Sequence, residues 1–153
     1  MKGERDMYRG KTVTQAINDA KQYLGRVTYT QDDRRGSFPY FDCSSFMGFI
    51  WGVNRFTDTD SMIGDFTAAG FQHISYPDYP NTANLRKGDV VVRPKSKGKG
   101  HTGMYIGGNN IIHCTVADGG VVVWNFDYRT YAPFTDILRS NNDGIFLVRW
   151  IKQ

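Results

Sequence analysis

An apolar segment that directly follows a short polar one constrains the fold more than any other feature of this sequence. Residues 46–53, Phe-Met-Gly-Phe-Ile-Trp-Gly-Val, are apolar nearly all round a helical turn, and such a helix is normally the buried one at the centre of a domain. Before it, residues 42–45 are polar or small, and Asp42 or Ser44 can cap the helix N-terminus. The sequence therefore predicts a central buried helix with Cys43 in or beside its first turn, where the helix meets solvent.

Two amphipathic helices are predicted on either side of the central one. Apolar residues recur at helical spacing from Val13 to Leu24, and Gly25 ends that stretch. A shorter helix is predicted over Ser61–Ala69, closed by Gly70.

The second half of the chain consists of short β-rich runs separated by turns of Gly, Asn and Asp. Because the helices precede the strands, we expect an α+β fold in which N-terminal helices pack on a C-terminal antiparallel sheet of about five strands. No repeat and no long linker interrupts the sequence, so residues 1–153 are predicted to form a single domain. The predicted strands are Val90–Val92, Thr102–Ile106, Asn110–Thr115, Val121–Phe126 and Ile145–Ile151.

Composition narrows the classes of function. Lys and Arg together number 19 against 15 Asp and Glu, a net charge of +4 that favours approach to a polyanionic surface without identifying it. No basic run alternates with aromatic residues, so nucleic-acid binding is not predicted. The sequence shows neither the apolar core of a secretion signal nor a run of about 18 apolar residues. We expect a soluble protein that binds no membrane and, because residues 98–102 lack the spacing of a phosphate loop, no cofactor.

Cys43 is a candidate nucleophile. Most free cysteines are buried core thiols, but the neighbours Asp42, Ser44 and Ser45 indicate the solvent-facing mouth of a helix. A helix N-terminus and a nearby imidazolium lower the pKa of a thiol, and the backbone N–H groups of the first turn can hold an oxyanion. We therefore expect a thiol that reacts well below pH 8.

The histidines number three, and two of them lie near predicted strands. His101 opens a strand, whereas His113 lies inside an apolar strand, where its imidazole needs a hydrogen-bond partner such as a base that it orients. Because they are 12 residues apart, both face the same way only if the connecting loop has an odd number of residues. A three-residue loop would satisfy this, and a two-residue turn at Gly108–Asn109 would put the imidazoles on opposite faces. His73 is interpreted as a surface or structural residue.

Cys114 is interpreted as the ordinary cysteine of the two. Alternation in the strand sends His113 and Cys114 to opposite faces, so a Cys43–Cys114 disulfide is not expected. Because His113 and Cys114 point to opposite faces, they cannot both bind one zinc ion. The sequence also has no pair of Cys or His residues at the short spacings typical of zinc sites, so no metal site is predicted.

Four ordered motifs resemble the landmarks of NlpC/P60 peptidase domains, and more narrowly those of the bacteriophage peptidoglycan hydrolase branch, the catalytic domains of phage endolysins. The resemblance spans roughly residues 27–128, and several motifs in order are more specific than any one of them. The motifs are Phe41-Asp42-Cys43-Ser44-Ser45-Phe46, Leu85-Arg86-Lys87-Gly88-Asp89-Val90, Gly100-His101-Thr102-Gly103-Met104-Tyr105-Ile106 and Asn110-Ile111-Ile112-His113-Cys114.

The resemblance implies a papain-like fold and a cysteine amidohydrolase or peptidase. It assigns Cys43 as nucleophile, His101 as general base and His113 as the residue that orients the base. It adds Tyr29 as a residue that lines the site and assists the oxyanion. The neighbours Asp42 and Ser44 are expected at the oxyanion or substrate, while Asp32 and Arg34 are expected either to contact substrate or to form an ion pair that holds their loop.

The resemblance also implies bacterial peptidoglycan as substrate, reached after release from the host cytoplasm. An N-acetylmuramoyl-L-alanine amidase is the favoured activity. A stem-peptide endopeptidase of the same fold, such as one that cuts D-glutamyl- or glutaminyl-L-lysine, is the alternative, and a non-catalytic wall-binding domain is a distant one. No wall-binding module is visible, so attachment is expected from a separate module or subunit, or from the positive charge acting on anionic wall polymers.

Overall fold

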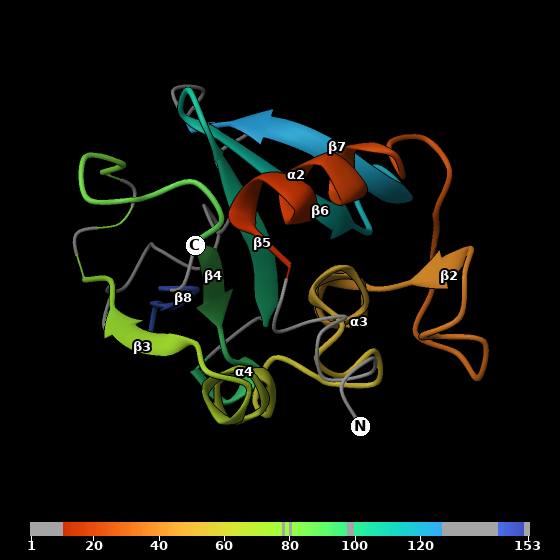
Figure 1. Ribbon diagram of the computed structural model, residues 1–153. Helices are drawn as coiled ribbons and strands as arrows, with labels where there is room; N and C mark the ends of the chain where they lie inside the picture. Colours follow the sequence, from red (N-terminus) through yellow and green to blue (C-terminus); the bar gives the residue numbers. More distant parts are fainter. Residues whose placement is uncertain (1–10, 78, 80, 98–99, 127–143, 152–153) are drawn as a thin grey trace.

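The computed structural model describes residues 11–77, 79, 81–97, 100–126 and 144–151, with the side chain of Lys97 excepted. In chain order its helices and strands are α2 (Val13–Lys21), β1 (Thr28–Tyr29), β2 (Tyr40–Phe41), α3 (Cys43–Trp51), α4 (Met62–Ala68), β3 (Gln72–Ser75), β4 (Val90–Arg93), a short 3₁₀ helix (Lys95–Lys97), β5 (His101–Gly107), β6 (Asn110–Thr115), β7 (Gly120–Asn125) and β8 (Phe146–Arg149). Apart from the short strands β1 and β2, the α-helices precede the strands (Figure 1). The predicted α+β class is confirmed.

Helix α3 is the predicted central helix, and its N-terminus is closed by a reciprocal capping box. The Asp42 carboxylate accepts a hydrogen bond from the Ser45 backbone N–H at 3.0 Å, and the Asp42 N–H donates to the Ser45 hydroxyl at 2.9 Å. Gly52 ends the helix in the left-handed conformation, with a φ of 67°. All its residues except Phe49 are buried, which confirms the prediction from the apolar pattern.

The main sheet has six strands in the order β3-β8-β4-β5-β6-β7, and each neighbouring pair is antiparallel. The predicted count of about five strands omitted β3, the edge strand that contains His73. Its side chains are mostly exposed, so its sequence carries no alternation between apolar and polar residues to reveal it. A separate pair of two-residue strands, β1 and β2, runs parallel beside α3.

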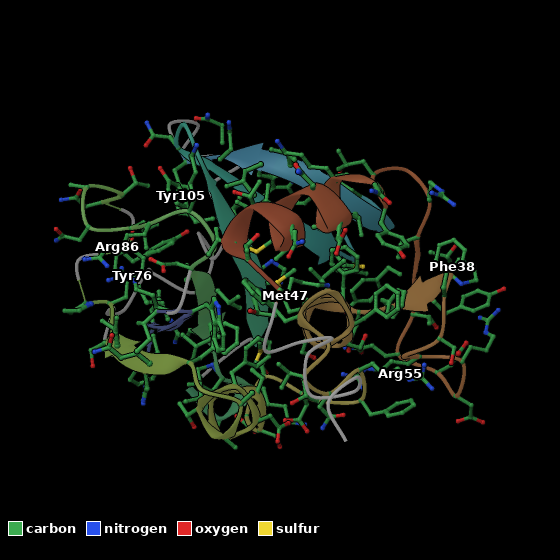
Figure 2. All side chains as sticks on the ribbon, viewed as in Figure 1. Phe38, Met47, Arg55, Tyr76, Arg86 and Tyr105 are labelled. Carbon is green, nitrogen blue, oxygen red and sulfur yellow. The ribbon has the colours of Figure 1, made fainter. Side chains whose placement is uncertain are left out.

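The two faces of the main sheet bury different clusters. Side chains of α2, α3 and α4 pack on the face that carries Met104, Ile112 and Val148, and Met47 lies in the middle of this core (Figure 2). The opposite face packs Val91, Tyr105, Ile111 and Leu147 against Tyr76, Tyr79, Phe126 and Ile145. The alternation along each strand separates the clusters, and helix α3 contacts β5 and β6.

A buried ion pair ties the start of β4 to the end of β8. Asp89 is 1% exposed and accepts two hydrogen bonds from Arg149, one from Nε to Oδ1 and one from Nη2 to Oδ2, each 2.8 Å long. The same carboxylate accepts the Arg86 backbone N–H at 2.8 Å. All polar demands of this buried carboxylate are thus met by the chain itself.

Removal of the Asp89 carboxylate should destabilise the fold. Asp89→Ala leaves the guanidinium of Arg149 without its partner, and we expect the free energy of unfolding to fall by about 3 kcal/mol in urea titrations followed by circular dichroism. Asp32→Ala removes an acidic partner that is exposed, so its unfolding midpoint should match that of the unmodified chain. Equal midpoints for the two variants would contradict this account.

Candidate active site

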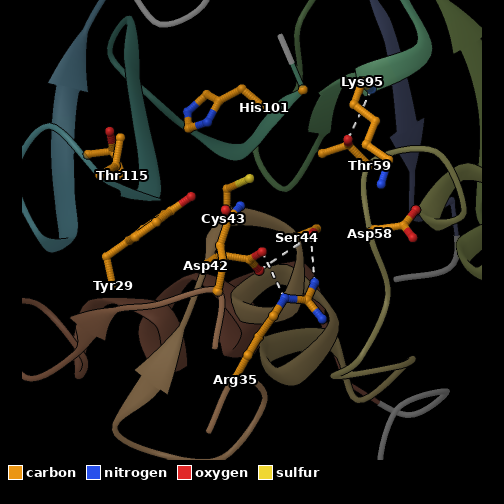
Figure 3. Close-up of a pocket in the computed structure, with 13 residues that line it drawn as sticks. Tyr29, Arg35, Asp42, Cys43, Ser44, Asp58, Thr59, Lys95, His101 and Thr115 are labelled. Atoms are coloured by element: carbon orange, nitrogen blue, oxygen red, sulfur yellow. Dashed lines mark hydrogen bonds and ion pairs between the residues drawn. The ribbon is translucent and has the colours of Figure 1, made fainter. Parts of the chain in front are cut away.

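A pocket of about 430 Å³ opens over the N-terminus of α3, with Cys43 in its lining (Figure 3). Cys43 is the first residue of the helix and is 6% exposed. The walls come from β1 and the β1–β2 connection, the start of α3, the loop after α3, the β4–β5 connection with the start of β5, and the end of β6 with the residue after it. The lining residues are Tyr29, Gln31, Arg35, Asp42, Cys43, Ser44, Asp58, Thr59, Lys95, Gly100, His101, Thr115 and Val116.

The β5–β6 hairpin brings His101 and His113 onto one face of the sheet. The sequence alone did not decide between a two-residue and a three-residue loop. Its loop is a two-residue turn, Gly108–Asn109, whose φ values of 61° and 63° are the positive ones that a type I′ turn requires. Such a turn alone would separate the histidines. The register shifts by one residue between Tyr105 and Gly107, so Ile106 is an extra residue in β5. This bulge restores the parity, and both imidazoles share a face.

The two imidazoles contact each other directly. The distance from Nε2 of His101 to Nδ1 of His113 is 2.7 Å, and their ring planes are inclined by 72°. This contact occupies one nitrogen of His101, so Nδ1 is the ring nitrogen left to exchange a proton with another group. His113 is fully buried at 0% exposure, whereas His101 lines the pocket.

Burial shifts the pKa of the Cys43 thiol and that of the His101 imidazole, in opposite directions. It raises the pKa of the Cys43 thiol to about 12, the charge of Asp42 adds to the rise, and the backbone N–H groups of Thr102 and Ser44 oppose it. Burial also lowers the pKa of His101 to about 4. The prediction of a thiol pKa lowered by the helix N-terminus is therefore wrong for this geometry, because the loss of water around the sulfur outweighs the favourable N–H groups.

Arg35 holds the N-terminus of α3 in place, and sequence reasoning missed it. Its Nε lies 2.7 Å from Oδ2 of Asp42, and its Nη2 donates to the Ser44 hydroxyl at 3.0 Å. The same guanidinium donates to the carbonyls of Phe56 and Thr57, in the loop that follows α3. Asp42 and Ser44 line the pocket as predicted, but their polar atoms are engaged in this network.

Asp32 and Arg34 form the ion-pair alternative that the sequence predicted. Oδ2 of Asp32 and Nη2 of Arg34 are 2.6 Å apart, with side chains 51% and 56% exposed. The Arg34 guanidinium also lies 4.2 Å from the centre of the Tyr40 ring. Neither residue lines the pocket. In the sequence Arg34 and Arg35 are adjacent and chemically identical, so only the fold distinguishes the one that reaches the site.

Tyr29 lies where the resemblance put it. It belongs to β1, and its hydroxyl points into the pocket beside Cys43 (Figure 3). Burial, followed by the proximity of Cys43 and Asp42, raises its pKa above the ordinary value for a phenol, so it stays protonated. A protonated phenol is a hydrogen-bond donor at neutral pH.

The far wall of the pocket was not anticipated. Thr59 accepts the Lys95 backbone N–H at 3.1 Å, and Asp60 accepts that of Ser96 at 2.9 Å. Gly100 allows this close approach, because a Cβ there would lie 2.3 Å from the Thr59 hydroxyl. Asp58 accepts the backbone N–H groups of Asp60 and Ser61 at 3.0 and 2.8 Å, in the turn that leads into α4.

Both cysteines are free thiols, and Cys114 is fully buried in the core beneath the helices. Its Sγ lies 3.4 Å from the carbonyl oxygen of Phe41. Within the described ranges, no three His, Cys, Asp or Glu side chains are grouped so that they could hold a metal ion. Among the same residues, no helix has the length and apolarity needed to cross a bilayer.

Comparison with known proteins places the chain in a family. Residues 12–143 match the family described as bacteriophage peptidoglycan hydrolase. The chain is 35% identical over 135 residues to a protein named lysin from Pneumococcus phage Dp-1, an alignment that covers 77% of this chain and 43% of that protein. It thus spans less than half the length of this relative.

Solved structures show the same fold at low sequence identity. NlpC2 of Trichomonas vaginalis has a TM-score of 0.59 at 18% identity, covering 95% of this chain and 50% of its own. The NlpC/P60 domain of the peptidoglycan hydrolase SagA gives 0.57 at 18%, covering 92% of this chain and 100% of its own. The P60 domain of an antigen from M. avium subspecies paratuberculosis gives 0.54 at 21%, covering 92% and 98%. The chain therefore belongs to the bacteriophage peptidoglycan hydrolase family and has the NlpC/P60 fold.

Proposed function

We propose that this chain is a catalytic domain that hydrolyses an amide bond of bacterial peptidoglycan by acyl transfer through Cys43. The observation that carries the proposal is the juxtaposition in one pocket of a thiol at a helix N-terminus and an imidazole whose other nitrogen contacts a second, buried imidazole at 2.7 Å. Nucleophile, base and orienting group in this order are the elements of a triad.

The first half of the reaction moves one proton and exchanges one bond. As the sulfur of Cys43 attacks the carbonyl carbon, Nδ1 of His101 accepts the thiol proton. The C–N bond then breaks, and the leaving amine takes that proton from His101. The acyl group remains on sulfur as a thioester. In the second half, His101 removes a proton from water, which attacks the thioester and returns the thiol.

The oxyanion that forms in both halves needs hydrogen-bond donors that are already in position. The backbone N–H groups at the start of α3 point out of the helix, because the first turn has no preceding carbonyls to bind. Tyr29 adds a phenol that burial keeps protonated, beside Cys43 (Figure 3). We assign these groups to the oxyanion and His113 to the orientation of His101.

The proposed bond is the one between N-acetylmuramic acid and L-alanine. Support comes from the resemblance of the four motifs to phage endolysins and from the name of the matching family, which is that of an amidase. We further propose that residues 1–153 act as a single domain. Attachment to the wall would then come from another module, or from attraction between the net charge of +4 and anionic wall polymers.

Substitution of the two cysteines should separate their roles. We expect Cys43→Ala to reduce the lysis of purified cell walls by about 10³-fold or more, because the nucleophile is lost. Cys114→Ala, the matched control, should keep the lytic rate and lower only the unfolding midpoint, since it removes a buried core thiol. A Cys43→Ala protein that still lyses walls would refute the proposed mechanism and favour a wall-binding role.

Mass spectrometry of digested peptidoglycan identifies the bond. An amidase releases complete stem peptides that begin with L-alanine and leaves muramic acid without a peptide. A stem-peptide endopeptidase leaves residues attached to muramic acid. We expect the first pattern, and muramic acid that keeps L-alanine would assign the endopeptidase activity instead.

The protonation of the pocket predicts how Cys43 responds to pH. With a thiol pKa of about 12 and an imidazole pKa of about 4, both groups are neutral between these values. In Cys114→Ala, where Cys43 is the remaining thiol, the rate of iodoacetamide labelling should still rise with pH above pH 9. The same protein in urea should titrate near the ordinary thiol value of about 8.5. A labelling rate that levels off below pH 8 in the folded protein would contradict a neutral pair.

A further inference from the structure

The proposed triad uses one ring nitrogen of His113, Nδ1, and assigns no role to the other, Nε2. Its Nδ1 contacts His101, but its Nε2 is buried and has no hydrogen-bond partner among the described residues. Buried ring nitrogens normally find a partner. The protonation state of this nitrogen therefore depends on what packs against it.

The contact between the imidazoles couples the tautomers of the two rings. If Nδ1 of His101 is to accept the thiol proton, the proton of that neutral ring must sit on Nε2 and be donated to Nδ1 of His113. The proton of His113 must then sit on its own Nε2. In the opposite arrangement His113 donates from Nδ1, His101 carries its proton on Nδ1, and the base is blocked. Catalysis through His101 thus requires a proton on the buried Nε2 of His113.

The indole of Trp124 packs against His113. In the β6–β7 ladder His113 pairs with Val122, so Trp124, two residues further on, lies on the same face of the sheet. The centres of the His113 and Trp124 rings are 4.6 Å apart and their planes are inclined by 79°. The indole is itself fixed, because its Nε1 donates to Oδ2 of Asp118 at 2.9 Å.

An aromatic ring distinguishes the two states of an imidazole nitrogen. Its negative face attracts an N–H and repels a lone pair. We propose that Trp124, held by Asp118, is a positioning residue that keeps the proton of His113 on Nε2 and thereby keeps Nδ1 of His101 free to act as the base. The inference rests on the proposed function, because it concerns the same pair of histidines.

The charged groups around the pair favour its neutral state. Arg93, which is 5% exposed, lies opposite His101 in the β4–β5 ladder, and the Asp118 carboxylate accepts a hydrogen bond from the indole of Trp124. On the α3 side Asp42 is paired with Arg35. A positive charge on either imidazole would add to the charge of Arg93 and would be poorly solvated in this buried setting.

The tautomers can be measured directly and without reference to activity. Long-range ¹H–¹⁵N spectra of the full chain at pH 7 should report both histidines protonated on Nε2. In Trp124→Leu, which removes the aromatic face, both rings should shift toward protonation on Nδ1. For this variant kcat on a soluble muropeptide should fall about 10- to 100-fold with KM changed less than about twofold.

Matched variants separate positioning from packing. Trp124→Phe retains an aromatic face and should keep most of kcat, while Asp118→Ala frees the indole and should lower kcat in the same direction as Trp124→Leu. Val123→Ala, on the same strand but at a side chain that is 38% exposed, should leave tautomers and kcat unchanged.

Two results would overturn the proposal. One is a proton on Nδ1 of His113 in the unmodified chain, a measurement that holds whether or not Trp124→Leu folds. The other is Trp124→Leu or Asp118→Ala with unchanged tautomers and kcat. An active Cys43→Ala protein would instead refute the proposed function, and the tautomer measurement would remain interpretable without it.

Discussion

The first turn of α3 depends on one carboxylate, that of Asp42. It accepts the Ser45 backbone N–H and hydroxyl through Oδ1, at 3.0 and 2.7 Å, and pairs with Arg35 through Oδ2 at 2.7 Å. The cap begins the helix one residue before Cys43, and the guanidinium joins this start to the loops on both sides. The same contacts therefore fix the position of Cys43, the direction of the backbone N–H groups in the first turn of α3, and the pocket wall that Arg35 forms.

Local patterns in the sequence were sufficient to predict helices α2, α3 and α4 and to name residues that line the pocket. The all-apolar stretch predicted a buried α3, and Cys43, His101 and Tyr29, which the resemblance assigned to the site, all line one pocket. Features that depend on long-range geometry were not predictable in the same way. The Ile106 bulge leaves no mark in composition, and the choice of Arg35 over its neighbour Arg34 depends on where residues 56 and 57 return.

Burial was the physical quantity hardest to judge from sequence. A polar Asp-Cys-Ser-Ser segment suggested a thiol open to water, yet Cys43 is 6% exposed and Ser45 is 0% exposed. Polar side chains near a helix start satisfy each other when they are buried, so their presence does not measure access to solvent. The consequence is that the Cys43 thiol and the His101 imidazole are both uncharged at neutral pH.

The β5–β6 hairpin also limits how its sequence can change in length. Its parity is the sum of a two-residue turn and one bulged residue, so losing or gaining a single residue anywhere between Tyr105 and Ile111 turns one imidazole to the other side of the sheet. A deletion in the bulge can be offset by an insertion in the turn, which then becomes the three-residue loop. A chain that keeps both imidazoles on one face can therefore combine a deletion with an insertion in this hairpin, but it cannot accept either change alone.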